Sequence, residues 1–187
     1  MEEKIIIDAD LCIKLGGSRK YRFLYDIIPL ISKEIYMHTY TYNEVLMPIS
    51  AVEQLRDLVL QRKIMLVNES NLVDKEKEIY NMAYRMLERV MINPSKPNKN
   101  RGEICSLAYA KAKHIPFFVT DEKDLQPIID RYLNVGIEDI MCLRIEDIVY
   151  RAKKGEIPIN RKVAKSLWII AGKRKELFDE EIWKINI

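Results

Sequence analysis

The chain has 187 residues, of which 48% are hydrophobic and 32% charged, so it is long enough for one domain with a full hydrophobic core. It contains no apolar run near the ~18 residues of a membrane-spanning helix. Its first four residues lack the basic start of a signal peptide, so we expect a cytoplasmic protein without membrane contact. Three scattered cysteines and two histidines argue against a disulfide framework, a zinc site and histidine-based acid–base catalysis. Any chemistry is therefore expected from carboxylates.

Short apolar runs alternate with helical patterns along the chain. The runs are continuous, as in strands buried on both faces of a parallel sheet, and they predict strands at residues 5–7, 35–37, 64–67, 117–119 and 140–143. Between them, the spacing of apolar residues predicts helices at residues 21–32, 50–62, 74–91 and 102–113. Ser50 to Glu53 has the pattern of a capping box at the start of the second helix, and Asn100 is the expected cap of the fourth.

This order of elements predicts an α/β fold in three α/β/α layers. Strands that alternate with helices are joined by right-handed crossovers, which gives a mostly parallel five-stranded sheet covered by helices on both faces. Prolines and asparagines make residues 93–101 a loop. We expect residues 1–150 to form this domain, and residues 151–187 to add a helical extension packed on it through Trp168, Phe178 and Trp183.

The extension is rich in basic residues. Between Arg151 and Lys175 the lysines and arginines are accompanied by a single acid, Glu156. Such a stretch attracts polyanions, or it is the solvated face of a terminal helix pair, and the sequence leaves both interpretations open.

Four acids are expected at the carboxyl edge of the sheet, where open α/β sheets place their active sites. Asp8 follows the first strand directly, and Asp121 follows the fourth strand after Thr120. Glu44 lies after the second strand, in the first turn of the next helix, and Glu103 lies in the first turn of the helix before the fourth strand. That helix runs antiparallel to the strand, so its N-terminus returns to the same edge.

Carboxylates that are brought together repel one another unless a cation neutralises them. A magnesium or manganese ion is the simplest partner, because hard cations take oxygen ligands. Each acid also has an ordinary interpretation. Asp8 and Asp10 could cap a helix or lie in a loop, and Glu44 could be an exposed helix residue. Glu103 could belong to a capping box, and Asp121 to a turn.

Four short motifs occur in a fixed order along the chain. They are Ile5-Ile6-Ile7-Asp8-Ala9-Asp10, Glu44 after the second strand, Arg101-Gly102-Glu103-Ile104-Cys105-Ser106-Leu107-Ala108, and Phe118-Val119-Thr120-Asp121-Glu122-Lys123-Asp124-Leu125. Together they resemble the PIN-domain nuclease family, from the first residues to about Asp124, and residues 152–158 resemble the tail of some PIN subfamilies. Each motif is weak alone, but their order on the strand–helix pattern makes the combination fairly specific.

The resemblance implies a PIN-like fold in which acids hold one or two Mg²⁺ or Mn²⁺ ions. It implies catalytic roles for Asp8, Glu44, Glu103 and Asp121, and metal ligands at Asp8, Glu103, Asp121 and Asp124. The fourth acidic position stays open between Asp121, Glu122 and Asp124. The commonest family pattern, Thr-any residue-Asp, would select Glu122, whereas Asp121 is preferred here because it lies nearest the strand end.

The resemblance also implies a function, the hydrolysis of single-stranded RNA as a metal-dependent endoribonuclease. Lys96, Lys99 and Arg101, in the loop before Glu103, would hold the phosphate backbone of the RNA, and Thr120 would help to hold the acid or the substrate. PIN proteins often act as the toxin of a bacterial toxin–antitoxin pair, which implies an antitoxin protein and a second copy of the chain as partners.

Two rival interpretations remain. One is a PIN-like binding module without turnover. The other is a haloacid-dehalogenase-like phosphatase, because Asp8-Ala9-Asp10 after a strand resembles the nucleophile and acid/base pair of that family. Residues 120–124 are a poor match to the later motifs that such a phosphatase requires.

Overall fold

The computed structural model describes residues 4–18, 20–136 and 138–183, and its centre is a sheet of five parallel strands. The strands are β1 (Ile5–Ile7), β2 (Ile35–His38), β3 (Met65–Val67), β4 (Phe117–Val119) and β5 (Met141–Leu143). Their order is β3-β2-β1-β4-β5, and all four pairings are parallel. The prediction of an α/β protein with a parallel five-stranded sheet is confirmed.

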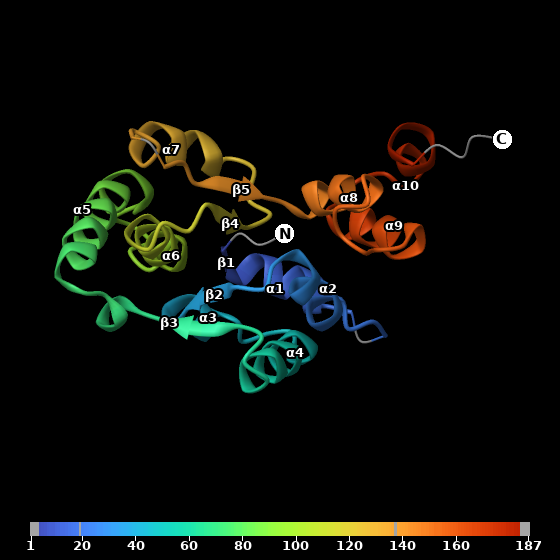
Figure 1. Cartoon of the computed structure of the whole chain (residues 1–187), viewed down its shortest axis with the longest axis horizontal. Coiled ribbons are helices and arrows are strands. Elements are labelled where there is room, and N and C mark those ends of the chain that lie inside the picture. Colours follow the sequence, from blue (N-terminus) through green and yellow to red (C-terminus); the bar gives the residue numbers. More distant parts are fainter. Residues whose placement is uncertain (1–3, 19, 137, 184–187) are drawn as a thin grey trace.

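Helices cover both faces of the sheet, as Figure 1 shows. One face carries α5 (Asp74–Met91), α6 (Arg101–Ala112) and α7 (Leu125–Tyr132). The other carries α1 (Ala9–Gly16), α2 (Phe23–Ile31), α4 (Ile49–Leu60), α8 (Ile145–Lys153) and α9 (Arg161–Ile170). The remaining helical segments are α3 (Thr39–Glu44), η1 (Glu69–Asn71), α10 (Lys175–Leu177) and η2 (Phe178–Ile182). This arrangement is consistent with the expected three layers.

The side chains of β1 explain why the sheet lies between two cores. Successive strand residues point to opposite faces, so Ile5 and Ile7 enter the core that contains α1, α2 and α4, while Ile6 enters the core that contains α5 and α6. All three side chains are fully buried, and each contributes about 1.5–3 kcal/mol to folding by leaving water. The continuous apolar run therefore marks the central strand of the sheet.

Several local predictions were wrong, although the order of the main elements was right. The short helices α1 and α3 were not predicted. Ser50 is not a cap, because α4 begins after Pro48, and the Ser50 hydroxyl instead donates to the Gly16 carbonyl at 2.7 Å. Asn100 precedes α6 with φ of 64° and makes no side-chain cap; its amide donates to the Met91 carbonyl at 3.0 Å.

The C-terminal helices pack on the core that contains α1, and the expected boundary at residue 150 falls inside α8. Trp168 and Phe178 are buried, and Trp183 stacks on Phe178 with ring centroids 5.9 Å apart. Several basic residues there are ion-paired: Arg161 and Lys165 contact Asp179, and Lys173 contacts Glu146. Part of the basic charge of this region is therefore compensated within the fold.

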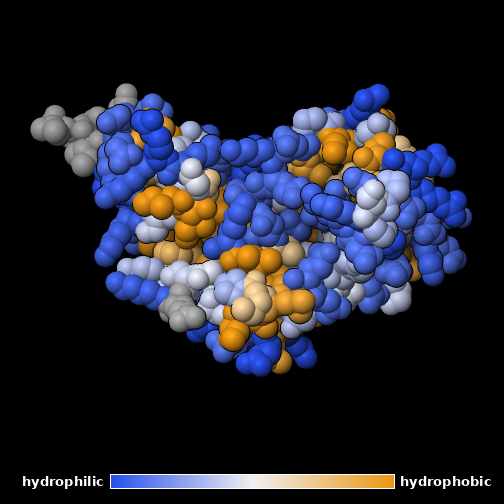
Figure 2. All heavy atoms as spheres, turned by 180° about the vertical axis from the view of Figure 1, so that it is seen from behind, coloured by the Kyte–Doolittle hydropathy of each residue, from blue (hydrophilic) through white to orange (hydrophobic). Residues whose placement is uncertain are grey.

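The surface seen from behind is mostly hydrophilic, with apolar residues in separate patches (Figure 2). The exposed apolar residues include Leu46, Met47 and Ile49, in the connection from α3 to α4. Within the described residues, no helix is both long and apolar enough to cross a membrane.

Candidate active site

Asp8 lies at the carboxyl end of the central strand and is the most deeply buried of the expected acids. Only 1% of it is exposed. Its Oδ1 accepts the Ala9 N–H at 2.8 Å, which makes Asp8 the N-cap of α1, and its Oδ2 accepts the Thr120 hydroxyl at 3.1 Å. Asp8 is therefore both a helix cap and a residue at the carboxyl edge of the sheet, as the two sequence interpretations proposed. The two hydrogen bonds fix the carboxylate between β1 and β4.

Burial and the negative charges of Glu103 and Glu122 together raise the pKa of Asp8 to about 8, against the two hydrogen bonds that lower it. Within the described ranges, no lysine or arginine forms an ion pair with Asp8, Glu44 or Glu103. A buried carboxylate with acidic neighbours and no basic partner favours its protonated form. Within the described residues, Asp8 therefore has no basic side chain that stabilises its negative charge.

Glu103 lies in the first turn of α6, as predicted, and is partly buried. Burial raises its pKa, and so do the charges of Glu122 and Asp10, while its own backbone N–H and the charge of Lys99 lower it. The N-terminus of α6 lies against the end of α3, because Gly102 contacts both Thr41 and Glu44. The charge of Glu103 raises the pKa of Asp8 and of Glu44.

Glu44 is the last residue of α3, not a first-turn residue of the following helix as predicted. The residue as a whole is exposed, but its carboxylate lies against the N-terminus of α6 and accepts the Gly102 N–H. Loss of hydration and the charge of Glu103 raise the pKa of Glu44 to about 7, against that hydrogen bond. Glu44 therefore fills the place of the missing cap of α6, where the positive end of the helix dipole favours a carboxylate.

The close approach of Glu44 to α6 depends on Gly102. A Cβ atom at this position would lie 2.1 Å from Glu44 Oε2 and 3.1 Å from Thr41 Oγ1. Any side chain would therefore displace the carboxylate. Gly102 was part of the recognised motif, but its contact with Glu44 joins residues far apart in the chain, and no sequence spacing indicates it.

Asp121 and Glu122 point to different partners. The Thr120 hydroxyl accepts the Glu122 N–H at 3.2 Å, and the charge of Glu122 raises the pKa of both Asp8 and Glu103. Asp121 instead contacts Lys14, whose Nζ lies 2.9 Å from Asp121 Oδ2 and 2.8 Å from Asp10 Oδ2. The charge of Glu122 thus acts on the buried acids, whereas the preferred Asp121 is ion-paired with Lys14, a residue that the sequence did not single out.

The other expected residues lie around this group. Asp124 is exposed at the N-terminus of α7 and is not among the charges that shift the pKa of Asp8, Glu44 or Glu103. Lys96 and Lys99 are exposed in the turns before α6. The Arg101 Nε donates to the Pro97 carbonyl at 2.8 Å. Thr120 is fully buried and donates to Asp8, so of the two roles expected for it the structure shows that of holding the acid.

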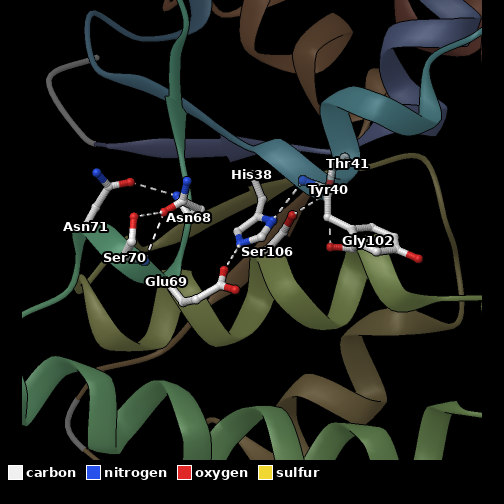
Figure 3. A network of polar contacts seen from close by, with 9 residues as sticks. All are labelled: His38, Tyr40, Thr41, Asn68, Glu69, Ser70, Asn71, Gly102 and Ser106. Atoms are coloured by element: carbon white, nitrogen blue, oxygen red, sulfur yellow. Dashed lines mark hydrogen bonds and ion pairs between the residues drawn. The ribbon is translucent and has the colours of Figure 1, made fainter.

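Polar contacts join α3 to α6 beside the acids (Figure 3). The Thr41 hydroxyl lies 3.1 Å from the Gly102 carbonyl, to which it donates, and 2.9 Å from the Ser106 hydroxyl, and both residues are fully buried. Buried polar groups that satisfy one another fix the relative position of the elements that carry them. Thr41, which sequence reasoning missed, therefore helps to set where Glu44 meets α6.

The donor chemistry of Asp8, Glu103 and Glu122 fits a hard divalent cation, because every donor is a carboxylate oxygen and their charges are uncompensated. With the side chains as they stand, no three His, Cys, Asp or Glu residues in the described part of the chain are placed to hold one ion between them. A magnesium ion commonly binds one or two carboxylates and keeps several waters. The fit is therefore to a partly hydrated ion.

Three comparisons with known proteins were made. No protein-family model, no curated protein and no solved structure matches the chain. Any assignment of function therefore depends on the site itself.

Proposed function

We propose that this protein is a divalent-metal-dependent phosphodiesterase that cleaves single-stranded RNA. The single observation that carries the proposal is the group of uncompensated carboxylates at the carboxyl edge of the sheet, with the fully buried Asp8 at its centre. Folding a protein around like charges costs free energy, and a divalent cation removes that cost. The resemblance of the motifs around Asp8, Glu103 and Thr120 to the PIN-domain nucleases supports the same function.

In the proposed mechanism, Asp8 would hold the cation together with one of its acidic neighbours, Glu103 or Glu122, and water would fill the remaining positions. When bound, a divalent cation supplies positive charge next to the phosphate and lowers the pKa of bound water. Thr120 and the Ala9 N–H keep the Asp8 carboxylate in one orientation, because they bond one oxygen each. Orientation of the ligand before the cation arrives reduces the cost of binding.

Glu44 is proposed as the residue that holds and releases a proton. Its pKa of about 7 lies near the operating pH of most cells, which is where general acid–base catalysis is most effective. Its carboxylate is held by the Gly102 N–H at the edge of the group of acids. A water or leaving oxygen of the substrate would exchange its proton with this carboxylate.

The phosphate backbone is proposed to lie across the turns before α6. Lys96 and Lys99 are exposed there, and the charge of Lys99 reaches Glu103. Lysines that contact phosphates position a strand without reading its bases. We therefore expect weak base preference, and cleavage of single strands that can bend into the edge of the sheet.

The proposal is tested by cleavage of labelled single-stranded RNA with Mn²⁺, with and without EDTA, by the protein and by Asp8→Asn. The matched control is Asp139→Asn, because Asp139 is an exposed acid before β5, at the opposite edge of the sheet. We expect Mn²⁺-dependent cleavage by the protein and by Asp139→Asn, and its loss in Asp8→Asn.

Equal cleavage by the protein and Asp8→Asn would mean a contaminating nuclease or a different site. The melting temperature with and without Mn²⁺ is measured on the same samples, because a ligand that binds only the folded state stabilises it. Absence of both cleavage and stabilisation would overturn the proposal and leave a binding module as the better interpretation.

A further inference from the structure

His38 is a buried histidine at the carboxyl end of β2, with only 3% of its surface exposed. It is the N-cap of α3, because its Nδ1 accepts the Tyr40 N–H at 3.2 Å. Its Nε2 lies 3.5 Å from Glu69 Oε2 and has no hydrogen-bond partner in the described part of the chain. Figure 3 shows the imidazole between these two groups.

This geometry determines where the proton of the imidazole lies. A nitrogen that accepts a hydrogen bond carries no proton, so Nδ1 is unprotonated. A neutral imidazole must then carry its proton on Nε2, directed to the Glu69 carboxylate. The cap of α3 thus exists in only one of the two neutral tautomers, and it does not exist in the protonated imidazolium, whose Nδ1–H would meet the Tyr40 N–H.

We infer that His38 positions α3, and with it Glu44, only while its imidazole is neutral, so that protonation of this one side chain releases the cap of the helix. The helix has only six residues, and a lost cap leaves a backbone N–H at its start without a partner. Helix α3 carries Thr41, which bonds α6, and ends at Glu44, which accepts the Gly102 N–H. Release at its N-terminus therefore loosens the contact of Glu44 with α6.

The surroundings of His38 have opposite effects on its pKa. Loss of hydration on burial lowers the pKa of His38, and the Glu69 carboxylate of η1 raises it. From α6, Tyr109 presents its ring at 6.3 Å, and the pKa of Tyr109 is raised by burial, so that it stays neutral. From β3, the residue paired with His38 is Val67, which carries no charge. His38 is thus neutral near pH 7 and gains its proton only below its ordinary pKa of 6.5.

The first experiment measures the tautomer directly by long-range ¹H–¹⁵N NMR of uniformly labelled full-length protein at pH 7.5. The chain has two histidines, His38 and His114, so His114→Asn assigns both signals. We expect His38 to be neutral, with the proton on Nε2 and an unprotonated Nδ1. A proton on Nδ1, or a doubly protonated ring, would overturn the inference.

The second experiment compares the pH dependence of the melting temperature of the protein and of His38→Asn. Asparagine is a good N-cap that does not titrate in this range. The sign follows from linkage: with a lowered pKa in the folded state, His38 contributes its full stability above its ordinary value of 6.5, and that stability is lost as the pH falls below 6.5. We expect the protein to lose 2–4 °C more than His38→Asn between pH 7.5 and 5, where roughly 2–4 °C corresponds to one lost cap.

The result is the change with pH in the difference between the two melting temperatures. A difference that is the same at every pH reports only the changed packing around residue 38. The control His114→Asn removes the other histidine, which is exposed and contacts Glu138, and its curve gives the pH dependence that this surface pair contributes. Parallel curves for the protein and His38→Asn would show that His38 protonation does not act on the fold.

A third measurement, the rise in melting temperature on adding Mn²⁺, tests the link to Glu44 and depends on the proposed function. We expect this rise to shrink more between pH 7.5 and 5.5 in the protein than in His38→Asn. An equal decrease in both would contradict the link to Glu44. If Mn²⁺ stabilises neither protein at any pH, the proposed function fails, and the tautomer and the slopes still decide the role of His38.

Discussion

Two groups of acids lie next to each other at the carboxyl edge of the sheet, and the fold treats them differently. In the outer group, Asp10 and Asp121 share the Lys14 ammonium at 2.8 and 2.9 Å. In the inner group, Asp8, Glu44 and Glu103 have raised pKa values, and within the described residues none of them is ion-paired to a lysine or arginine. The comparison teaches that acidic side chains alone do not mark a site; the absence of a basic partner distinguishes the inner group.

The largest expected contrast separates Glu122 from Asp121. Glu122→Gln removes a charge that reaches Asp8 and Glu103, whereas Asp121→Asn leaves Lys14 paired with Asp10. We expect Glu122→Gln to weaken Mn²⁺ binding by roughly 10–100-fold, and Asp121→Asn by less than about threefold. Calorimetric titration measures both affinities, and a larger loss in Asp121→Asn would reverse the assignment of inner and outer acids.

The next contrast uses the close approach at Gly102. A Cβ atom there would lie 2.1 Å from Glu44 Oε2, so Gly102→Ala pushes the carboxylate away from α6. Alanine also improves the helix by up to about 1 kcal/mol, so we expect little loss of stability. RNA cleavage is expected to fall by roughly 10–100-fold, because a small displacement of a catalytic group has a large effect on rate. Unchanged cleavage with unchanged stability would remove Glu44 from the mechanism.

The pH dependence of the metal-free protein tests the inner group as a whole. The pKa of Asp8 rises from its ordinary value of 3.8 to about 8 in the folded protein, and that of Glu44 from 4.5 to about 7. For raised pKa values, stability is full below the unfolded values and is lost as the pH rises through the folded ones. We therefore expect the melting temperature in EDTA to fall between pH 6.5 and 9, where His38 is neutral. Asp8→Asn should reduce this decline. A melting temperature of the unmutated protein that does not change with pH would contradict the claim that the inner acids lack a basic partner.

The smallest expected effect concerns the outer pair. Lys14→Met leaves Asp10 and Asp121 without their cation. Because Lys14 and Asp10 are both more than one-third exposed, at 37% and 40%, solvent screens the interaction. We expect a loss of about 0.5–1 kcal/mol in the free energy of unfolding, measured by urea denaturation. Mn²⁺ should restore more stability to Lys14→Met than to the protein; an equal response would show that Lys14 does not stand in for a cation.

The strands were predictable because their apolar runs are continuous, as in the fully buried central strand β1. Helices α1 and α3 were missed for different reasons. Helix α1 is short and ends at paired glycines, and α3 has the sequence Thr-Tyr-Thr-Tyr-Asn-Glu, in which only Glu44 is a strong helix former. Its cap is a histidine, which no capping rule indicates.

The acids Asp8 and Glu103 were predictable from their places after a strand and at a helix start. The choice between Asp121 and Glu122 was not, because it depends on a side chain reaching back to the main chain. The Thr120 hydroxyl accepts the Glu122 N–H and donates to Asp8. Lys14, which lies in the unpredicted helix α1, forms an ion pair with Asp121. The contacts of Thr120 with Asp8 and of Lys14 with Asp121 join residues that are distant in sequence, and spacing carries no information about them.

The inner acids come from the ends of β1 and α3 and from the start of α6, and Glu122 follows β4, so these residues are close only in the folded chain. An unfolded chain offers them singly and binds a divalent cation weakly. Under the proposed function, the free cation concentration would then set the stability of the fold. At about one hundred times the Kd, binding adds about 2.7 kcal/mol to the free energy of unfolding. Depletion of the metal would leave the same molecules more open to unfolding and proteolysis, so that abundance and activity would decline together.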